Sequence, residues 1–231
     1  MSSQMMTVPA RILDAPDVQY DRSKQSPKLA SWNLIKTKFA KSGVIKKWSY
    51  LIIHQGQDPY GYDRQACIGI IKEFKAQCGI QGLTMPDPYV PAPVNGADPH
   101  EVWLPVGPTN PAVVTDALVK AFGNFVKNQI PIVYVFLPSA DKVIYASVKY
   151  AGDVACGIQT VCSQWPKVSK ERGRPQYLAN VSLKWNLKMG GVNHLIGGPT
   201  FHRRIKEQKI MIVSSPPFSS FHDADRLLGW L

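Results

Sequence analysis

Two pairs of side chains with helical spacing are the residues of this sequence best suited to binding chemistry. Tyr145 and Lys149 lie four positions apart in one amphipathic segment, and Lys184 and Lys188 lie four positions apart in another. Residues with this spacing share one face of a helix. Two lysine faces and an aromatic ring suit a phosphate group with a flat base attached, because the ring can stack on the base. The spacing therefore predicts a nucleotide-binding site.

Each of these four residues also has an ordinary structural explanation, which the sequence leaves open. Tyr145 can cover the rim of the core, and Lys149 can be a surface lysine. Lys184 and Lys188 can extend their ammonium groups into solvent. Like charges at this spacing cost an isolated helix roughly 0.2–0.5 kcal/mol. An anion held between the two lysines would turn that repulsion into an attraction.

Residues near the two pairs add to the predicted site or support it. Thr160 and Cys162 end a predicted strand, where a hydroxyl group and a backbone N–H can donate to a phosphate oxygen, although both can equally be plain strand residues. Leu183 and Leu187 are expected to mark the buried stripe of the second helix. Trp185 is expected to pack in the core rather than contact a ligand.

The composition indicates a globular protein with an acidic partner. The chain has 231 residues, of which 45% are hydrophobic and 19% charged, enough for one large domain or a domain with an appendage. Its formal net charge of +11 favours nucleic acid as the partner, ahead of an anionic membrane surface. A basic surface that only keeps the protein soluble is the alternative.

Cysteine spacing and the amino terminus indicate a compartment. The four cysteines have neither CxxC spacing nor a neighbouring histidine, so no zinc site, other metal or cofactor is expected. Reduced thiols are the simplest interpretation, which predicts a cytoplasmic or nuclear protein. The first residues lack the apolar segment of a secretion signal, and no apolar run approaches the roughly 20 residues of a membrane span.

Apolar patterning predicts an α/β domain. Segments with helical apolar spacing alternate with short apolar runs rich in β-branched residues. The predicted strands are 48–55, 130–138, 158–162 and 209–215, and the predicted helices are 63–79, 110–127, 142–156 and 176–190. This alternation favours a mostly parallel sheet with helices on both faces. Ligands of such sheets bind beyond the carboxyl ends of the strands.

Three regions are expected along the chain. Residues 1–45 are too poor in apolar residues to fold alone and are expected to form an extended arm. Residues 46–200 form the predicted domain, which includes an irregular proline-rich connection over 80–109. Residues 201–231 are expected to begin a further strand and to end in a divergent tail.

Familiar catalytic motifs are absent, and the binding hypothesis has two rivals. No GxGxxG follows a strand, and neither GxxxxGK[ST] nor GxSxG occurs. An enzyme acting on a phosphorylated metabolite would need a general base, for which Asp141 and Asp153 are the nearest acids. Asp153 can equally pair with Lys149 four positions before it. A protein-interaction module would use the proline-rich connection as its contact surface.

Two stretches resemble the MID domain of eukaryotic Argonaute proteins. They are YASVKYAGDVACGIQTVCSQ and PQYLANVSLKWNLKMGGVNHLI, in which Y-x-x-x-K, G-x-x-T-x-C and N-x-x-L-K-x-N-x-K-x-G-G-x-N follow one another in the family's order. The resemblance is specific over 139–196, rests on strand and helix order over 47–138, and extends over 8–45 to the linker that precedes this domain. The long proline-rich connection is more similar to a fungal than to an animal member.

The resemblance implies a Rossmann-like fold and a role in RNA-mediated gene silencing. The domain would anchor the 5′-phosphorylated first nucleotide of a small guide RNA, with no chemistry of its own, and Tyr145 would stack on the first base. The implied phosphate ligands are Tyr145, Lys149, Thr160, Lys184, Lys188 and the backbone amide of Cys162. The implied base-specificity loop is Ser139, Ala140, Asp141, Lys142 and Val143, and weaker RNA contacts would come from Gln164 and Asn180.

The sequence also departs from the family pattern. Val161 stands where many relatives have glutamine, so one amide contact to the phosphate is expected to be lost. The family continues into a nuclease-like Piwi domain, which supplies basic groups to the phosphate pocket and is the expected partner of this domain. A strand of that domain ends in G-x-D-x-[ST]-H-P, whereas no aspartate stands at the end of 209–215. The Piwi nuclease is therefore expected to be absent from this chain, which resembles a piece of a longer protein.

Overall fold

The computed structural model of the protein describes most of the chain between residues 17 and 197. The described ranges are 17–26, 32–56, 62–93, 98–105, 110–193 and 195–197, the last as backbone only. The predicted strand over 209–215 and the predicted tail over 201–231 lie outside these ranges.

The body is built on a four-stranded parallel sheet. Its strands are β3 (Ser49–Gln55), β4 (Glu101–Leu104), β5 (Ile132–Leu137) and β6 (Gln159–Gln164), in the order β4-β3-β5-β6. β5 is an unbroken apolar run with every residue buried, as expected for an inner strand of a parallel sheet. β6 forms one edge of this sheet. The predicted α/β fold is therefore confirmed.

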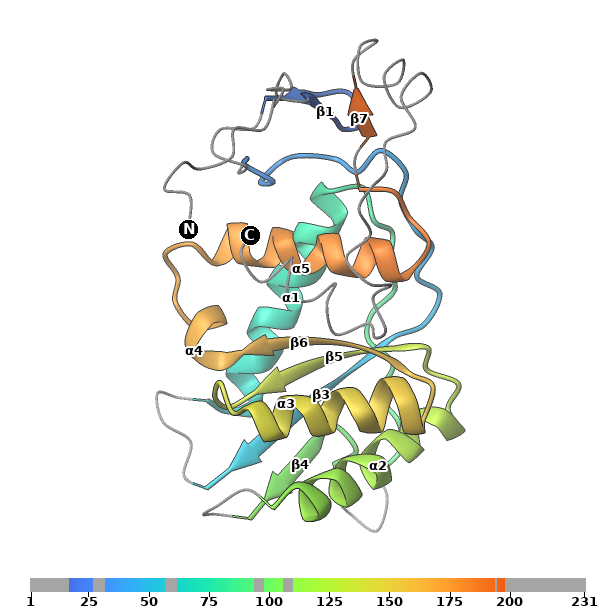
Figure 1. Cartoon of the computed structure of the whole chain (residues 1–231), viewed down its shortest axis with the longest axis vertical. Coiled ribbons are helices and arrows are strands. Elements are labelled where there is room, and N and C mark those ends of the chain that lie inside the picture. Colours follow the sequence, from blue (N-terminus) through green and yellow to red (C-terminus); the bar gives the residue numbers. More distant parts are fainter. Residues whose placement is uncertain are drawn as a thin grey trace, which may run out of the picture.

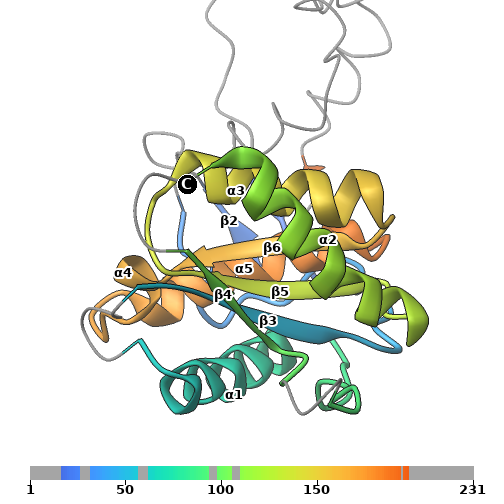
Figure 2. The ribbon, with the colours of Figure 1, turned by 90° about the horizontal axis from the view of Figure 1, so that it is seen from below.

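Helices cover both faces of the sheet. In Figure 1, one side is covered by α1 (Arg64–Ile80) and α5 (Arg174–Lys188), and the other by α2 (Pro111–Lys127) and α3 (Lys142–Lys149). Figure 2, seen from below, shows α2 crossing in front of the strands. The caps form as the sequence predicts, because the side chains of Asp63 and Asn110 accept hydrogen bonds from backbone N–H groups in the first turns of α1 and α2.

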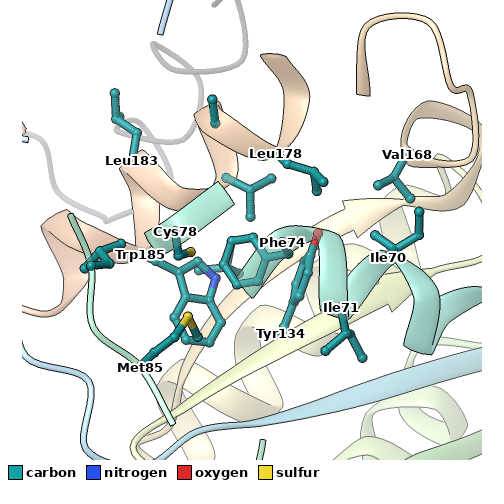
Figure 3. Close-up of a cluster of buried hydrophobic side chains, with 14 of the residues drawn as sticks. Ile70, Ile71, Phe74, Cys78, Met85, Tyr134, Val168, Leu178, Leu183 and Trp185 are labelled. Atoms are coloured by element: carbon teal, nitrogen blue, oxygen red, sulfur yellow. The ribbon is translucent and has the colours of Figure 1, made fainter. Parts of the chain in front are cut away.

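The sheet face under α1 and α5 is packed with aromatic and aliphatic side chains (Figure 3). Trp185 of α5 is fully buried, with its ring centroid 5.3 Å from that of Phe74 in α1 and 5.3 Å from that of Trp48. Trp185 thus packs in the core as predicted. Because the ring cannot turn out of this cluster, it fixes how α5 is rotated over the sheet and therefore where the neighbouring lysines point.

The helix predicted over 142–156 has two parts. It is α-helical to Lys149 and continues as the π-helix η2 (Tyr150–Ala155). A π-helix has hydrogen bonds between residues five apart, so the residues after Lys149 are rotated relative to a continued α-helix. Short π-helical segments are frequent at functional sites, and this one contains Asp153.

Two further elements lie where the sequence predicts irregular structure. β4 lies inside the proline-rich connection 80–109 and pairs with β3. α4 (Trp165–Val168) lies in the loop expected between β6 and α5, and it begins with a proline in its first turn. Both are short, and their positions depend on the elements beside them more than on their own patterns.

The described part of the amino-terminal arm, residues 17–26 and 32–45, packs onto the body. Its strands β1 (Asp17–Gln19) and β2 (Lys24–Gln25) form an antiparallel sheet with β7 (Leu195–Gly197), which follows α5 (Figure 1). Further along the arm, Lys41 pairs with Val192 through hydrogen bonds of 2.9 and 2.8 Å. The arm therefore packs where α5 ends, on the side of the molecule that holds the predicted lysines.

The crevice that parallel sheets commonly offer to ligands is filled in this protein. That crevice lies beyond adjacent strands whose connections leave to opposite faces, which here are β3 and β5. The hydroxyl group of Tyr62 lies there, 3.0 Å from the carbonyl oxygens of both Ile53 and Phe136, and Tyr62 is 1% exposed. Tyr62 thus occupies this position among the described residues, and the edge strand β6 is the next place to look.

Candidate functional site

The edge strand β6 contacts the helical segments that hold the predicted lysines. It lies between α5 on one face of the sheet and α3 with η2 on the other (Figure 1). Tyr145 and Lys149 lie in α3, Thr160 and Cys162 in β6, and Lys184 and Lys188 in α5. The three segments that the sequence singles out are thus neighbours in the fold.

Lys149 points from α3 to the outer edge of β6. Its Nζ donates a hydrogen bond of 2.9 Å to the carbonyl oxygen of Thr160 and lies 3.5 Å from the Asp153 carboxylate. The residue is 7% exposed, so its charge is largely removed from bulk water. Its Nζ also lies 5.7 Å from the ring centroid of the half-buried Tyr145. The predicted pairing of Lys149 with both Tyr145 and Asp153 is observed.

Thr160 is held by hydrogen bonds to Asp153. It is fully buried, and its hydroxyl group donates to the Asp153 carboxylate at 2.9 Å, as does its backbone N–H at 2.8 Å. Gly152 lies so close to the Thr160 methyl group that a side chain there would clash with it. The Thr160 hydroxyl is therefore engaged by Asp153 in this structure, and the residue presents its backbone carbonyl to Lys149.

The backbone of Cys162 faces the same edge as that of Thr160. Successive residues of a strand direct their backbone groups to alternate sides, so residues two apart share a side. The Thr160 N–H and carbonyl both bond outward, to Asp153 and Lys149, rather than to β5. The Cys162 N–H, which the resemblance implies is a phosphate donor, consequently points to the outer edge of β6.

The end of α5 is joined to the beginning of β6. The Gln159 side chain donates to the carbonyl oxygen of Lys188 at 3.3 Å, one residue before Thr160. Lys184 and Lys188 are both half-buried, and their spacing places them on one stripe of α5 with Asn180. The half-buried Asn180 accepts a hydrogen bond of 3.2 Å from Gln176. The structure therefore brings Lys188 to the same end of β6 as Thr160.

The predicted base-specificity loop caps α3. The Asp141 carboxylate accepts hydrogen bonds from the N–H groups of Val143 at 2.7 Å and Ile144 at 3.1 Å, and the Asp141 N–H donates to the Ser139 hydroxyl at 3.3 Å. Ala140 and Lys142 are exposed. The loop follows β5, and the half-buried Gln164 ends the neighbouring strand β6, so both lie at the carboxyl end of the sheet.

A groove beside α3 is lined by Lys142 and Val143 of the predicted loop but by none of the other predicted site residues. It runs between α2 and α3 with a volume of about 360 Å³. Its lining residues are Pro111, Thr115, Lys142, Val143, Ala146, Ser147 and Tyr150. Neither Tyr145 nor Lys149 lines it, because they lie on another stripe of α3. The candidate site at β6 is therefore identified by its lysines and not by a pocket.

Sequence reasoning missed two residues that shape this site, Gln159 and Asn186. Both have amide side chains. Gln159 directly precedes Thr160, and Asn186 lies between the two lysines of α5. The signal in the sequence was Gly190 with Gly191, because glycines directly after a helix are typical of a hydrogen-bonded helix end.

The described residues form neither a metal site nor a membrane-spanning helix. Within those ranges, no group of three His, Cys, Asp or Glu side chains is placed to hold a metal ion. Nor does any helix there combine the length and apolar content that crossing a bilayer requires.

A family model described as the Piwi domain matches residues 132–215. This range begins at β5 and includes α3, β6 and α5, so all the candidate site residues lie within it. Because the match extends to residue 215, the expectation that the Piwi domain is absent from this chain is not supported.

Known proteins similar to this chain are Argonautes. Argonaute 10 of Arabidopsis thaliana is 25% identical over 201 residues, which are 85% of this chain and 19% of that protein, so the chain spans about a fifth of this relative. The structure of the N. crassa QDE-2 AGO MID-PIWI domains aligns with a TM-score of 0.52 and 27% identity, over 70% of this chain and 39% of that one.

The same fold occurs in Kluyveromyces polysporus Argonaute, solved with a guide RNA, at a TM-score of 0.59 and 22% identity over 84% of this chain and 22% of that chain. These similarities agree with the parallel sheet and with the order of its helices. The chain is therefore homologous to Argonaute proteins, and its described domain is similar to the MID region of the QDE-2 structure.

Proposed function

We propose that this chain binds the 5′-monophosphate end of a small guide RNA as part of an Argonaute silencing complex. The observation that supports this most is the position of Lys149, whose buried ammonium lies at the outer edge of β6 and 5.7 Å from the Tyr145 ring centroid. A cation next to an aromatic ring offers one group for a phosphate and one for the attached base.

Each group of the site has a defined part in this proposal. The first base stacks on Tyr145, and the phosphate lies across the edge of β6, between Lys149 on one side and Lys184 and Lys188 on the other. The outward N–H of Cys162 donates to a phosphate oxygen. Hydrogen bonds to an ionised acceptor contribute about 1.5–3 kcal/mol each, so three lysines and one amide suffice for phosphate-dependent binding.

Asp153 has a structural part rather than a catalytic one. Its carboxylate accepts from the Thr160 N–H and hydroxyl group and pairs with Lys149. These partners account for its position without a substrate, which disfavours an enzyme that uses Asp153 as a general base. Binding without chemistry is therefore the role proposed for the described domain.

The known proteins that resemble this chain support the same role. The solved K. polysporus Argonaute contains a guide RNA, and a net charge of +11 suits a polyanionic partner. We infer that the partners are a small RNA and the rest of an Argonaute chain, including its Piwi domain, and that the complex works in the cytoplasm or the nucleus.

Titration with uridine 5′-monophosphate and with uridine, followed by NMR or calorimetry, tests the proposal. Lys188→Ala should weaken binding of the monophosphate roughly 10- to 100-fold, which corresponds to the loss of one charge-assisted contact. Tyr145→Ala should weaken the monophosphate and the nucleoside alike, because stacking does not depend on the phosphate.

Lys127→Ala is a matched control, since Lys127 is an exposed lysine at the end of α2 and its removal changes the net charge equally. This variant should bind as the unchanged protein does. Equal affinity for uridine and its monophosphate, or equal losses in Lys127→Ala and Lys188→Ala, would contradict the proposal.

A further inference from the structure

We propose that Asn186 is a positioning residue for the phosphate site, which makes the amino-terminal arm a structural part of that site. The inference rests on the proposed function, because the lysines that Asn186 positions are those assigned to the phosphate. Asn186 lies midway between Lys184 and Lys188, and two residues along a helix point to nearly opposite sides. The lysines therefore face the site while Asn186 faces the protein, where it is fully buried.

The Asn186 side chain bonds to the arm with both of its polar atoms. Its Oδ1 accepts a hydrogen bond of 2.7 Å from the Gly43 N–H, and its Nδ2 donates one of 3.1 Å to the Lys41 carbonyl. Gly43 and Asn186 are 143 residues apart in the chain. The last turn of α5 is thereby fastened to a segment that precedes the first strand of the parallel sheet.

A second buried amide completes this network. Asn193 accepts a hydrogen bond of 2.7 Å from Asn186 Nδ2 and donates one of 2.9 Å to the Leu183 carbonyl in α5. It is 2% exposed, so the network is closed to solvent. Buried amides whose donors and acceptors are all bonded favour one arrangement over others, because any shift leaves a polar atom without a partner.

Two glycines allow the segments to come this close. A Cβ at Gly43 would lie 2.7 Å from the Met189 carbonyl oxygen. A Cβ at Gly191 would clash with the Asn186 amide. Any side chain at either position would push the arm or the chain after α5 away from the last helical turn.

The helix end itself has a rigid hydrogen-bonded form. The Gly191 N–H donates to the Asn186 carbonyl at 2.8 Å and the Gly190 N–H to the Leu187 carbonyl at 3.1 Å, and Gly190 has a φ of +77°. These two bonds with a left-handed glycine form a Schellman motif. The Asn186 backbone carbonyl thus belongs to the helix cap, and its side chain fastens the same turn to the arm. Loss of the side chain removes the second of these restraints on the turn that bears Lys188.

The network predicts a selective effect on the phosphate. Asn186→Ala should weaken binding of uridine 5′-monophosphate roughly 3- to 30-fold, while uridine affinity, set by stacking on Tyr145, stays within about twofold. Gly43→Ala should have the same selective effect, although it leaves Asn186 itself unchanged. A residue that only supported the fold would lower both affinities together.

Asn128→Ala is the matched control for these variants. Asn128 ends α2 and likewise joins a helix end to a distant segment, by accepting from the Tyr89 hydroxyl group at 2.9 Å. Its removal should leave the ratio of the two affinities unchanged. If Asn186→Ala and Gly43→Ala also leave that ratio unchanged while Lys188→Ala lowers it, the inference fails and the proposed function stands. If Lys188→Ala leaves it unchanged as well, the proposed function itself fails.

If the variants do not fold, hydrogen exchange of the Gly43 N–H in the unaltered protein tests the same inference. Phosphate binding should slow exchange of the Gly43 N–H at least several-fold, because ligand and network share the last turn of α5. Uridine should not have this effect. Equal Gly43 exchange with and without uridine 5′-monophosphate, under conditions where the ligand is bound, would overturn the inference.

Discussion

The Lys149 ammonium lies 2.9 Å from the carbonyl oxygen of Thr160, so a side chain of α3 bonds to the outer edge of the strand that it covers. An edge strand normally offers such groups to water or to another chain. Here a cation occupies part of the edge, and the Asp153 carboxylate occupies another part. The edge of β6 is thereby closed to strand pairing at Thr160.

Lys149→Met should separate the structural and binding parts of this lysine. Methionine keeps the unbranched shape but leaves the Thr160 carbonyl and the Asp153 carboxylate without their cation, which should lower the free energy of unfolding by about 1–3 kcal/mol. Phosphate-dependent affinity should fall roughly 10- to 100-fold. Urea denaturation and calorimetric titration measure the two effects. If the folded variant binds the monophosphate as tightly as the unchanged protein, Lys149 does not contact the phosphate.

Asp153→Asn should raise the affinity for uridine 5′-monophosphate while it destabilises the fold. The variant retains an oxygen acceptor for Thr160 but removes a negative charge 3.5 Å from Lys149. Weakening the charge-assisted bonds to Thr160 should cost about 1–2 kcal/mol of unfolding free energy. The gain in affinity should shrink as salt is raised, because the interaction is electrostatic. An affinity that falls in the folded variant would show that Asp153 mainly orients Lys149.

Tyr62→Phe should lower stability without changing nucleotide binding. The hydroxyl group lies between the carbonyl oxygens of Ile53 and Phe136, at 3.0 Å from each. Its removal leaves a buried carbonyl group without a donor, which should cost about 0.5–1.5 kcal/mol. A thermal melt measures this loss, and titration with uridine 5′-monophosphate is the control. A changed affinity would mean that the crevice between β3 and β5 takes part in binding.

Much of the fold could be predicted because its apolar spacing is unambiguous. The run from Ile132 to Leu137 reads as a buried strand and is one, and the predicted helix over 110–127 has an asparagine cap and a proline at its first position, as observed. The pairing of Tyr145 with Lys149 followed from helical spacing alone. These features are local, so a single sequence contains the information for them.

Features that depend on distant segments could not be predicted in this way. Leu187 was expected in the buried stripe of α5, but it is 49% exposed, whereas the polar Asn186 beside it is fully buried. The reason is that the arm supplies bonds for the Asn186 amide. The π-helical turn after Lys149 was not predicted either, and its residue Asp153 bonds to Thr160 in β6. Neither feature is visible in apolar periodicity.

Acidification should destabilise the domain through His100, far from the proposed site. Its ring is fully buried, stacked on Tyr50 at a centroid distance of 4.1 Å, with Nδ1 3.2 Å from the Asp98 carboxylate and Nε2 3.1 Å from the Ser49 hydroxyl group. Burial lowers the pKa of His100 below its usual value, although the Tyr89 carbonyl and Asp98 oppose this shift.

The folded protein therefore keeps His100 neutral at a pH where the unfolded chain binds a proton. This contribution to stability is complete above the unfolded pKa of about 6.5 and is lost as the pH falls through the lowered value in the folded protein. The free energy of unfolding, measured by urea denaturation, should fall between pH 7 and pH 5. His100→Gln should be less stable at pH 7 but should lose less stability over this interval, because glutamine does not titrate. The same loss in the variant and in the unchanged protein would assign the acid sensitivity to other groups.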